Sequence, residues 1–202
     1  MDEIKHKILQ GAENLFMTHG FKSVTMDDVC RELGISKKTL YQYFNDKNEL
    51  VSNCITNHLN NTNCSCNNII NAHDDAIDTM VKITEFVGNQ LKSINPSAVY
   101  DLKKYFRESW DLLDKNMKSF VYDNIKRNIE QGQKKGYYRK DLNIDIVAAI
   151  YVHLINLVID PEFVGKGPDT RVLHLEIIKY HIHAICTAKG QELFAAKSKH
   201  LI

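Results

Sequence analysis

The feature that most constrains this chain is a pair of short amphipathic segments separated by a tight turn, Gly34-Ile35-Ser36. The first segment carries apolar residues at helical spacing: Met26, Val29, Cys30 and Leu33. We predict a helix over about 26–33 that Gly34 ends, and a second helix that Ser36 caps and that runs to Tyr43. Two short helices on so tight a turn, braced by a longer helix, form a helix-turn-helix unit.

A longer helix is predicted immediately before this pair, over about 2–19. Its apolar stripe consists of Ile4, Ile8, Ala12 and Leu15. Gly20 stands where a left-handed residue would end it. Thr25 and Asp28 then have the spacing of a capping box at the start of the next helix, with Asp in place of the usual Glu.

The second short helix has a polar outer face whose side chains suit DNA. On a helical wheel of residues 36–44, Leu40 and Phe44 point inward and Lys38 and Gln42 point directly away. Thr39 and Tyr41 flank the outer pair, and Lys37 and Tyr43 lie at the margins. Such a face offers hydrogen-bonding groups for base edges at its centre and groups for phosphates at its border. The alternative interpretation is an ordinary solvated helix face, which is the commoner case for an isolated segment of this kind.

The wider sequence favours the DNA interpretation. The string Gly34-Ile35-Ser36-Lys37-Lys38-Thr39-Leu40-Tyr41-Gln42-Tyr43-Phe44-Asn45-Asp46-Lys47-Asn48-Glu49-Leu50 follows Leu15-Phe16, Gly20-Phe21, Thr25-Met26 and Val29. This pattern, over about residues 4–55, closely resembles the N-terminal domain of the tetracycline-repressor (TetR) family of bacterial regulators. Elsewhere the resemblance is architectural, except for a turn similar to the one before the family's penultimate helix: Gly132, Gly136, Arg139 and Asp141.

The resemblance implies which residues contact DNA. Thr25, Tyr43 and Lys47 match positions that usually contact phosphates. The groove-facing positions are matched by Lys37, Lys38, Thr39, Tyr41 and Gln42, and Ser36 at the helix start completes the predicted DNA-binding set. Lys38 departs from the pattern, because many members have a small residue there, and this leaves the operator sequence undefined.

Charge restricts how the chain can bind DNA. The whole protein has a net charge of +1, and residues 1–53 hold seven Lys+Arg against eight Asp+Glu. Binding must therefore rest on the local lysines Lys37, Lys38 and Lys47 and on helix N-terminal amides.

Composition predicts an all-α protein. Three Pro and nine Gly in 202 residues are too few for the turns of an all-β chain. The start of the chain has no apolar signal segment, and the longest apolar run, 146–152, is far below a membrane span of about 20 residues. We expect a cytoplasmic location and reduced thiols without disulfides, since the five cysteines have no framework spacing.

Periodicity predicts the remaining helices. A long fourth helix follows Asp46 and should be weak or bent over 57–71, where seven residues are Asn. Further helices are expected at about 75–93, 97–112, 116–135, 144–159 and, after a loop at 165–168, a final long helix at about 169–188. The resulting fold is a helix-turn-helix DNA-binding domain over 1–48 and a helical ligand-binding and dimerisation domain over 49–202, with about nine helices in all.

Aromatic side chains in the second domain suggest a ligand site. The predicted set combines apolar rings with a few polar tips, as ligand pockets do: Phe86, Tyr105, Phe106, Trp110, Phe120, Tyr151 and His153. Core packing explains the aromatic residues equally well, and only the resemblance to a ligand-sensing family favours the pocket. Residues 103–140 carry a net charge of +6, which is either a solvated face or an attraction for an anionic ligand.

Other candidate sites are weak. Cys64-Ser65-Cys66 with His58 and His73 lacks the second close pair typical of zinc sites, so we expect no metal and no cofactor. The histidines of the last helix, His174, His181 and His183, are interpreted as core or interface residues. No phosphate loop, nucleophile elbow or metalloprotease motif is present, and we expect no enzyme activity. A small helical enzyme and a protein-interaction module remain the alternatives. DNA affinity that falls steeply with salt would favour a regulator over both.

Residues 144–159 predict a dimer, because thirteen of the sixteen are apolar and one packing surface covers only part of a helix. The last helix adds an apolar stripe: Val172, Leu175, Ile178, Ile182 and Ile185. Two such helices from each subunit would form a four-helix interface, where the TetR family places its dimer contact. We therefore predict a homodimeric regulator, in function a repressor that a small apolar or amphipathic molecule releases from a palindromic operator. The sequence does not identify the effector, the operator or the regulated genes. It also leaves open whether the protein activates transcription instead of repressing it.

Overall fold

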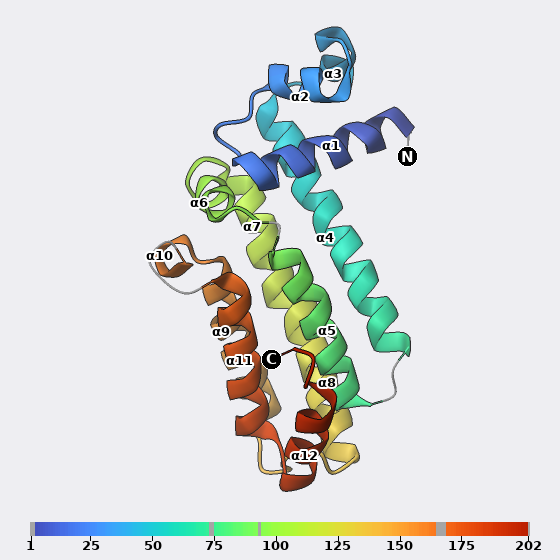
Figure 1. Cartoon of the computed structure of the whole chain (residues 1–202), viewed down its shortest axis with the longest axis vertical. Helices are drawn as coiled ribbons and strands as arrows, with labels where there is room; N and C mark the ends of the chain where they lie inside the picture. The colour runs from blue at the N-terminus through green and yellow to red at the C-terminus, as the bar shows by residue number, and fades with distance from the viewer. Residues whose placement is uncertain (1–2, 73–74, 93, 165–168, 202) are drawn as a thin grey trace. The chain divides into compact units, whose positions relative to one another are not determined.

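The computed structural model describes residues 3–72, 75–92, 94–164 and 169–201, and their regular secondary structure is entirely helical apart from one antiparallel bridge between Tyr138 and Cys186 (Figure 1). The predicted all-α class is confirmed. None of the described helices combines the length and apolar character needed to cross a membrane.

The described helices form two compact units. Unit 1 contains residues 1–62 with 93–115, and unit 2 contains residues 63–92 with 116–202. The segment 93–115 thus packs with the helix-turn-helix region, although it lies far along the sequence. The division of function at residue 48 remains a prediction, since packing alone does not test it.

Unit 1 is built around the predicted helix-turn-helix. Its helices are α1 (Glu3–His19), α2 (Met26–Leu33), α3 (Lys37–Tyr43), the first part of α4 (Lys47–Ala72), α6 (Pro96–Tyr105) and most of α7 (Arg107–Asn116). Thr25 and Asp28 form the predicted capping box, and Ser36 caps α3 by accepting the Thr39 N–H. Gly34 ends α2 with φ of 63°, a left-handed conformation that costs glycine little.

The core of unit 1 joins these helices through large buried side chains. Phe16, Phe21, Leu40 and Phe44 are almost completely buried, and the rings of Phe16 and Phe21 stack with centroids 5.1 Å apart. Leu40 and Phe44 therefore point inward as the helical wheel predicts. This burial leaves the opposite face of α3 to solvent.

Helix α6 is tied to the end of α1 and to the loop after it. The backbone N–H of Asn95 donates to the Met17 carbonyl at 2.9 Å, and the Asn95 amide donates to the Thr18 carbonyl at 3.0 Å. Further along α6, the buried Asp101 carboxylate accepts the Lys22 N–H at 2.8 Å. The α1–α2 loop and α6 are thus held together by directional bonds.

The predicted single helix over 97–112 is wrong, because the chain breaks at Phe106. This residue adopts φ of −127° and ψ of 62°, so its ring is buried against Phe21 at a centroid distance of 6.0 Å. The Phe106 carbonyl then accepts the Trp110 N–H at the start of α7. The predicted break near 112–116 is also absent, since α7 continues through the π-helical turn η1 (Met117–Val121) into α8 (Tyr122–Lys134).

Unit 2 is a helical bundle. Besides the last part of α4, the end of α7, η1 and α8, it contains α5 (Ala76–Leu91), α9 (Ile144–Asn156), η2 (Leu157–Ile159), α10 (Pro161–Val164), α11 (Thr170–Ile185) and α12 (Ala188–Lys197). Helix α5 packs against α8, α11 and α12, and α9 packs against α8 and α11. The expected loop at 165–168 lies outside the described residues.

A polar chain crosses the core of this bundle. The buried Tyr138 hydroxyl donates to the Asn128 side-chain oxygen at 3.0 Å, and the Asn128 amide donates to the Ala76 carbonyl at 2.8 Å. Gly132 lies under the Tyr138 ring, where an added Cβ would stand 2.1 Å from a ring carbon. Glycine at position 132 is therefore required by this packing.

The predicted long fourth helix is present, and α4 runs through the Asn-rich stretch as one helix of 26 residues. Two differences from the sequence predictions concern the last helix. The predicted last helix is not final, because α12 follows it. Within α11, Ile178, Ile182 and Ile185 are buried in the core of unit 2, so the apolar stripe assigned to the dimer contact is mainly a core face.

Candidate nucleic-acid interface

Helix α3 presents a polar outer face with the predicted composition. Lys38, Tyr41 and Gln42 are exposed, Thr39 is half-exposed, and Leu40 on the opposite side is fully buried. The outer face therefore holds an ammonium, a phenol and an amide, three groups that can hydrogen-bond to base edges or phosphates.

Lys37 is engaged within the protein. Its ammonium lies 2.8 Å from a carboxylate oxygen of Asp27 on α2, and both side chains are largely exposed. The Asp27 hydrogen bond and charge raise the pKa of Lys37. An exposed pair of this kind is weak, so Lys37 can exchange Asp27 for a phosphate or a base.

Thr25 is paired with an acidic neighbour. Its hydroxyl donates to an Asp28 carboxylate oxygen at 2.7 Å, and its N–H donates to the same oxygen at 2.9 Å. These two hydrogen bonds, the side-chain one first, lower the pKa of Asp28, which also pairs with Arg31. The predicted phosphate contact at Thr25 therefore lies beside a carboxylate whose charge Arg31 offsets.

Lys47 is partly buried at the start of α4. Its ammonium donates to the Lys22 carbonyl at 3.1 Å and lies 5.5 Å from the centre of the Phe106 ring. Desolvation lowers the pKa of Lys47, and the carboxylates of Asp101 and Asp28 act in the opposite direction. Tyr43, the third predicted phosphate contact, is half-buried against the core of unit 1.

A helix-turn-helix with this exposed face matches a known family. The model for bacterial regulatory proteins of the tetR family matches residues 8–54, which include α2, α3 and the predicted DNA contacts. The chain belongs to the TetR family. It is therefore a DNA-binding transcriptional regulator, and the expectation that it is not an enzyme agrees with its relatives.

Similar proteins extend the match beyond the first domain. The uncharacterized HTH-type transcriptional regulator YvaF of Bacillus subtilis is 27% identical over 175 residues, which cover 85% of this chain and 90% of YvaF. The negative transcriptional regulator IcaR of the icaADBC biofilm operon in Staphylococcus aureus is 27% identical over 52% of this chain and 71% of IcaR.

Solved structures share the fold of this TetR-family chain. A putative transcriptional regulator from Saccharomonospora viridis in complex with choline has a TM-score of 0.72 and 20% identity, covering 93% of this chain and all of that one. The regulator FadR from Bacillus subtilis in complex with stearoyl-CoA has a TM-score of 0.67 and 12% identity, covering 88% and 97% of the two chains.

The seven residues predicted to bind a ligand are divided between the units of the TetR-family chain. Tyr105, Phe106 and Trp110 lie in unit 1, where Phe106 and Trp110 pack against the core and Tyr105 is exposed beside Lys22 and Lys104. The other four lie in unit 2: Phe86, Phe120, Tyr151 and His153.

The unit 2 members differ in accessibility. Tyr151 is buried, and its ring meets that of His181 edge-on at 4.7 Å. Phe86 and Phe120 are half-buried, whereas His153 is exposed on α9.

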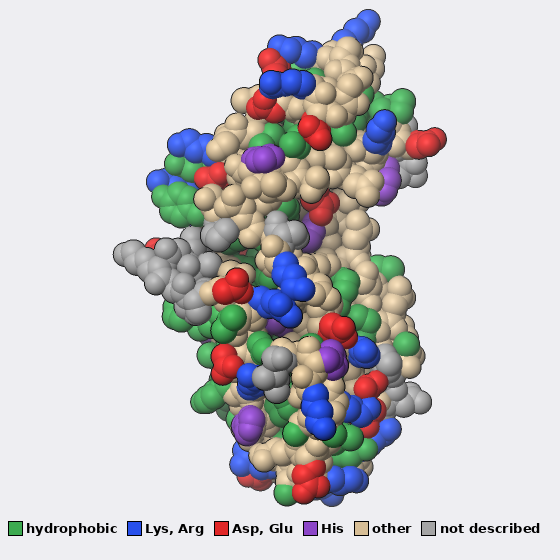
Figure 2. Space-filling view, in the orientation of Figure 1, with side chains coloured by type: hydrophobic (Ala, Val, Ile, Leu, Met, Phe, Trp, Pro, Cys, Tyr) green, Lys and Arg blue, Asp and Glu red, His purple; other side chains and the backbone are tan. Residues whose placement is uncertain are grey.

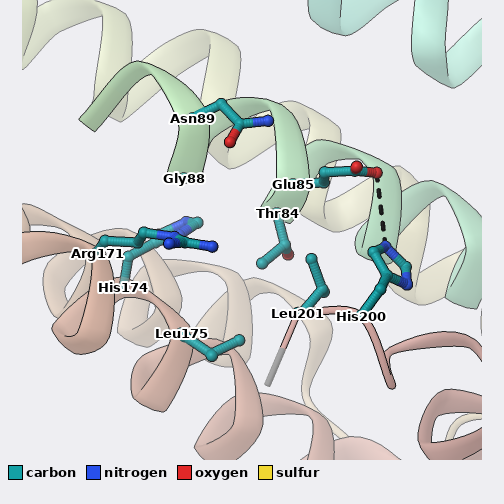
Figure 3. A pocket seen from close by; sticks show the side chains of 9 residues that line it. All are labelled: Thr84, Glu85, Gly88, Asn89, Arg171, His174, Leu175, His200 and Leu201. Atoms are coloured by element: carbon teal, nitrogen blue, oxygen red, sulfur yellow. Dashed lines mark ion pairs between the residues drawn. The ribbon is translucent and has the colours of Figure 1, made fainter. Parts of the chain in front are cut away.

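The structure outlines a different pocket, which sequence analysis did not predict. It lies between α5, α11 and the C-terminal residues of unit 2 (Figure 3). Its lining residues are Thr84, Glu85, Gly88, Asn89, Arg171, His174, Leu175, His200 and Leu201. They come from three separate segments, so no local motif identifies them.

Two of the three histidines on α11 belong to the core, as predicted. His174 and His181 are buried, and desolvation lowers the pKa of each to about 4, whereas His183 is exposed. The Nε2 atom of His181 has no hydrogen-bond partner among the described residues.

The suggested metal or thiol site gains no geometric support. Cys64 is exposed, whereas Cys66 is buried and desolvation raises its pKa to about 11. His73 lies outside the described residues, and within the described ones no three His, Cys, Asp or Glu side chains are grouped to hold a metal.

Proposed function

We propose that this TetR-family protein is a repressor that binds a palindromic operator as a homodimer and leaves it when a small molecule binds. The exposed polar face of α3 carries this proposal, because it lies within the segment that matches the family model. Repression is supported by the similarity to IcaR, which is a negative transcriptional regulator of the icaADBC biofilm operon.

The DNA contacts divide into two classes. Lys38, Tyr41 and Gln42, with Lys37 and Thr39 beside them, would read base edges in the major groove. Thr25, Ser36, Tyr43 and Lys47 would hold phosphates and fix the position of α3. Figure 2 shows acidic and basic side chains interspersed on the face in view, as expected if DNA affinity rests on a few local cations.

A homodimer would form through α9 and α11. Ile146 and Ile150 on α9 are 57% and 51% exposed, and Val172 and Tyr180 on α11 are 54% and 68% exposed. These side chains share one face on each helix, and the helices pack against each other within unit 2. Apolar faces exposed on two adjacent helices favour a four-helix contact with a second copy of the chain.

The effector would be apolar or amphipathic. Solved regulators of the same fold include one in complex with choline and one in complex with stearoyl-CoA, so proteins of this fold bind chemically different small molecules. Of the seven predicted contacts, Phe86 and Phe120 both lie in unit 2 and combine apolar rings with partial exposure.

Helix α6 would transmit the ligand signal. Asp101 and Phe106 contact the loop that leads to Thr25, and Lys47 reaches the same loop through the Lys22 carbonyl. A ligand that favours another position of α6 would therefore displace predicted phosphate contacts. DNA and ligand would then weaken each other's binding by the same factor.

The test is enrichment of binding sequences from a random duplex pool with the full-length protein. We expect a palindromic consensus with half-sites one helical turn apart or a multiple of that, bound with an affinity that falls steeply with salt. A pool without a consensus, or binding that does not respond to salt, would contradict the proposal.

The variant that tests the role of α3 combines Lys38→Ala with Gln42→Ala. Both side chains are exposed, so the double variant should fold as the wild type does and lose the consensus. An unchanged consensus would show that α3 is not the reading helix.

A further inference from the structure

The pocket between α5, α11 and the C-terminal residues has an open cationic end. Its empty volume is about 430 Å³, including the part open to solvent. Figure 3 shows the Arg171 side chain extending from α11 toward Thr84 on α5. No side-chain hydrogen bond or ion pair joins its guanidinium to any residue that the structure describes. A guanidinium is charged at every physiological pH and presents a planar set of donors that fits a carboxylate.

His174 supplies a buried polar group in the same pocket. It is 4% exposed, lines the pocket one helical turn after Arg171, and has no hydrogen-bond partner among the described residues. Burial lowers its pKa to about 4, so the ring is neutral at pH 7 and offers one N–H donor. The ring can therefore donate this N–H to a ligand in the pocket.

The rest of the pocket is apolar or already paired. Leu175 and Leu201 provide apolar surface, and Gly88 places no side chain in the space. The Thr84 hydroxyl donates to the Met80 carbonyl at 2.7 Å, so it can only accept from a ligand.

The far end of the pocket is anionic. The Glu85 carboxylate lies 3.6 Å from His200 (Figure 3). It also pairs with Lys82 at 3.3 Å. This carboxylate would repel a second negative charge on a ligand whose first charge is held at Arg171.

We propose that this pocket binds a small monocarboxylate with a short apolar chain. The carboxylate would accept hydrogen bonds from Arg171 and His174, and the chain would lie against Leu175 and Leu201. This site is separate from the aromatic side chains proposed for the effector, since none of them lines it. Its occupation would join α5, α11 and the C-terminal residues, and it requires no DNA.

The test uses butyrate as the probe and full-length protein without DNA. The histidine ring signals are followed by ¹H–¹³C NMR during titration at constant ionic strength. We expect a saturable shift of the His174 signal with a dissociation constant in the millimolar range, about what a ligand of six heavy atoms can reach. Butyramide lacks the charge and succinate carries a second one, so each should bind at least tenfold more weakly.

Variants identify the groups responsible. Arg171→Gln should weaken butyrate binding at least tenfold, whereas Arg127→Gln on the exposed side of α8 should leave it unchanged. His174→Gln assigns the signal, and Leu201→Asp, which adds a charge at the half-buried rim, serves as a second variant should His174→Gln fail to fold. Absence of saturation, equal binding of butyrate and butyramide, or unchanged binding by Arg171→Gln would each overturn the proposal.

Discussion

The side-chain carboxylate of Asp101 on α6 accepts a 2.8 Å hydrogen bond from the backbone N–H of Lys22 in the loop between α1 and α2. The carboxylate is buried, and an added Cβ at Gly20 would stand 2.9 Å from its Oδ2 atom. Gly20 has φ of 90°, so its left-handed backbone and its missing side chain both allow the loop to approach α6.

Removal of this acceptor should weaken both the fold and DNA binding. Asp101→Ala removes a hydrogen bond to a charged acceptor in a partly buried site, which we expect to cost about 1–3 kcal/mol in the free energy of unfolding. DNA affinity should fall as well, because the same loop leads to Thr25. Urea denaturation and fluorescence anisotropy measure the two effects. Asp141→Ala, an exposed carboxylate in unit 2, is the control that should change neither quantity.

Removal of a charge beside α3 should strengthen DNA binding. Asp27→Asn releases Lys37 from its ion pair and takes a negative charge away from the predicted interface. We expect roughly twofold to fivefold tighter binding at low salt, and a smaller gain as salt screens the interaction. Asp123→Asn on the exposed side of α8 should have no effect. Weaker binding by Asp27→Asn would place this carboxylate among the DNA contacts instead.

The two contact classes should respond differently to substitution. Lys47→Ala and Tyr43→Phe should weaken binding to all sequences, and Lys47→Ala should lower the salt slope by about one. Gln42→Ala and Lys37→Ala should relax the preference at individual base pairs, by roughly 1–3 kcal/mol in the case of Gln42. Operator selection with each variant distinguishes these outcomes. A changed consensus with Lys47→Ala and an unchanged one with Gln42→Ala would reverse the assignment.

Two isoleucines should separate dimer formation from folding. Ile150→Glu alters an exposed residue of α9, so the helical signal should persist while the protein sediments as a monomer. Ile182→Glu places a charge where the side chain is fully buried in the core of unit 2, so it should unfold the chain. Analytical ultracentrifugation and circular dichroism measure these outcomes. A wild-type protein that sediments as a single 23.3 kDa species at micromolar concentration would exclude the dimer.

Acid should destabilise unit 2 through its buried histidines. The pKa of His181 is lowered from 6.5 to about 4 in the folded chain, so below pH 6.5 the unfolded chain binds the proton more tightly. Stability is therefore lost as the pH falls from about 6.5 toward 4, and His181 accounts for up to about 3 kcal/mol of this loss. His181→Phe should reduce the difference between unfolding free energies at pH 7.5 and pH 5. An equal pH dependence in wild type and variant would show that the pKa of His181 is the same in the folded and unfolded chains.

Local signals allowed the first three helices to be predicted closely. Thr25 with Asp28, Gly34 and Ser36 each act on the few residues beside them, so a sequence pattern is sufficient to identify the caps. The polar outer face of α3 also follows from periodicity, because Leu40 and Phe44 are large enough to fix which side is buried.

Long-range contacts explain what the sequence did not predict. Phe106 breaks a helical pattern without any proline or glycine, because its ring packs against Phe21 from the loop between α1 and α2. In α12, Gly190 is a helix residue that has the Tyr137 carbonyl only 2.2 Å from the position of an added Cβ. Glycine is a poor helix former, and this close packing explains its place inside α12, a helix that the sequence analysis did not predict.

Long-range packing also decides which face of α11 is buried and where the polar pocket lies, so local sequence patterns predict neither. Val172 and Ile182 are equally apolar, and only the packed bundle shows that the first is exposed and the second is buried. Arg171, His174 and Glu85 come together because α5 and α11 pack side by side.

The distribution of thiols in this protein makes it suitable for site-specific labelling without engineered cysteines. Cys30, Cys54, Cys66 and Cys186 are buried, and desolvation raises the pKa of each, so they should react slowly with maleimides. Cys64 is the exposed thiol, and all five cysteines lie in described parts of the chain. A spin label attached there would place one probe on each subunit of a dimer. Pulsed electron spin resonance of the native sequence would then report the distance between the two α4 helices with and without operator DNA.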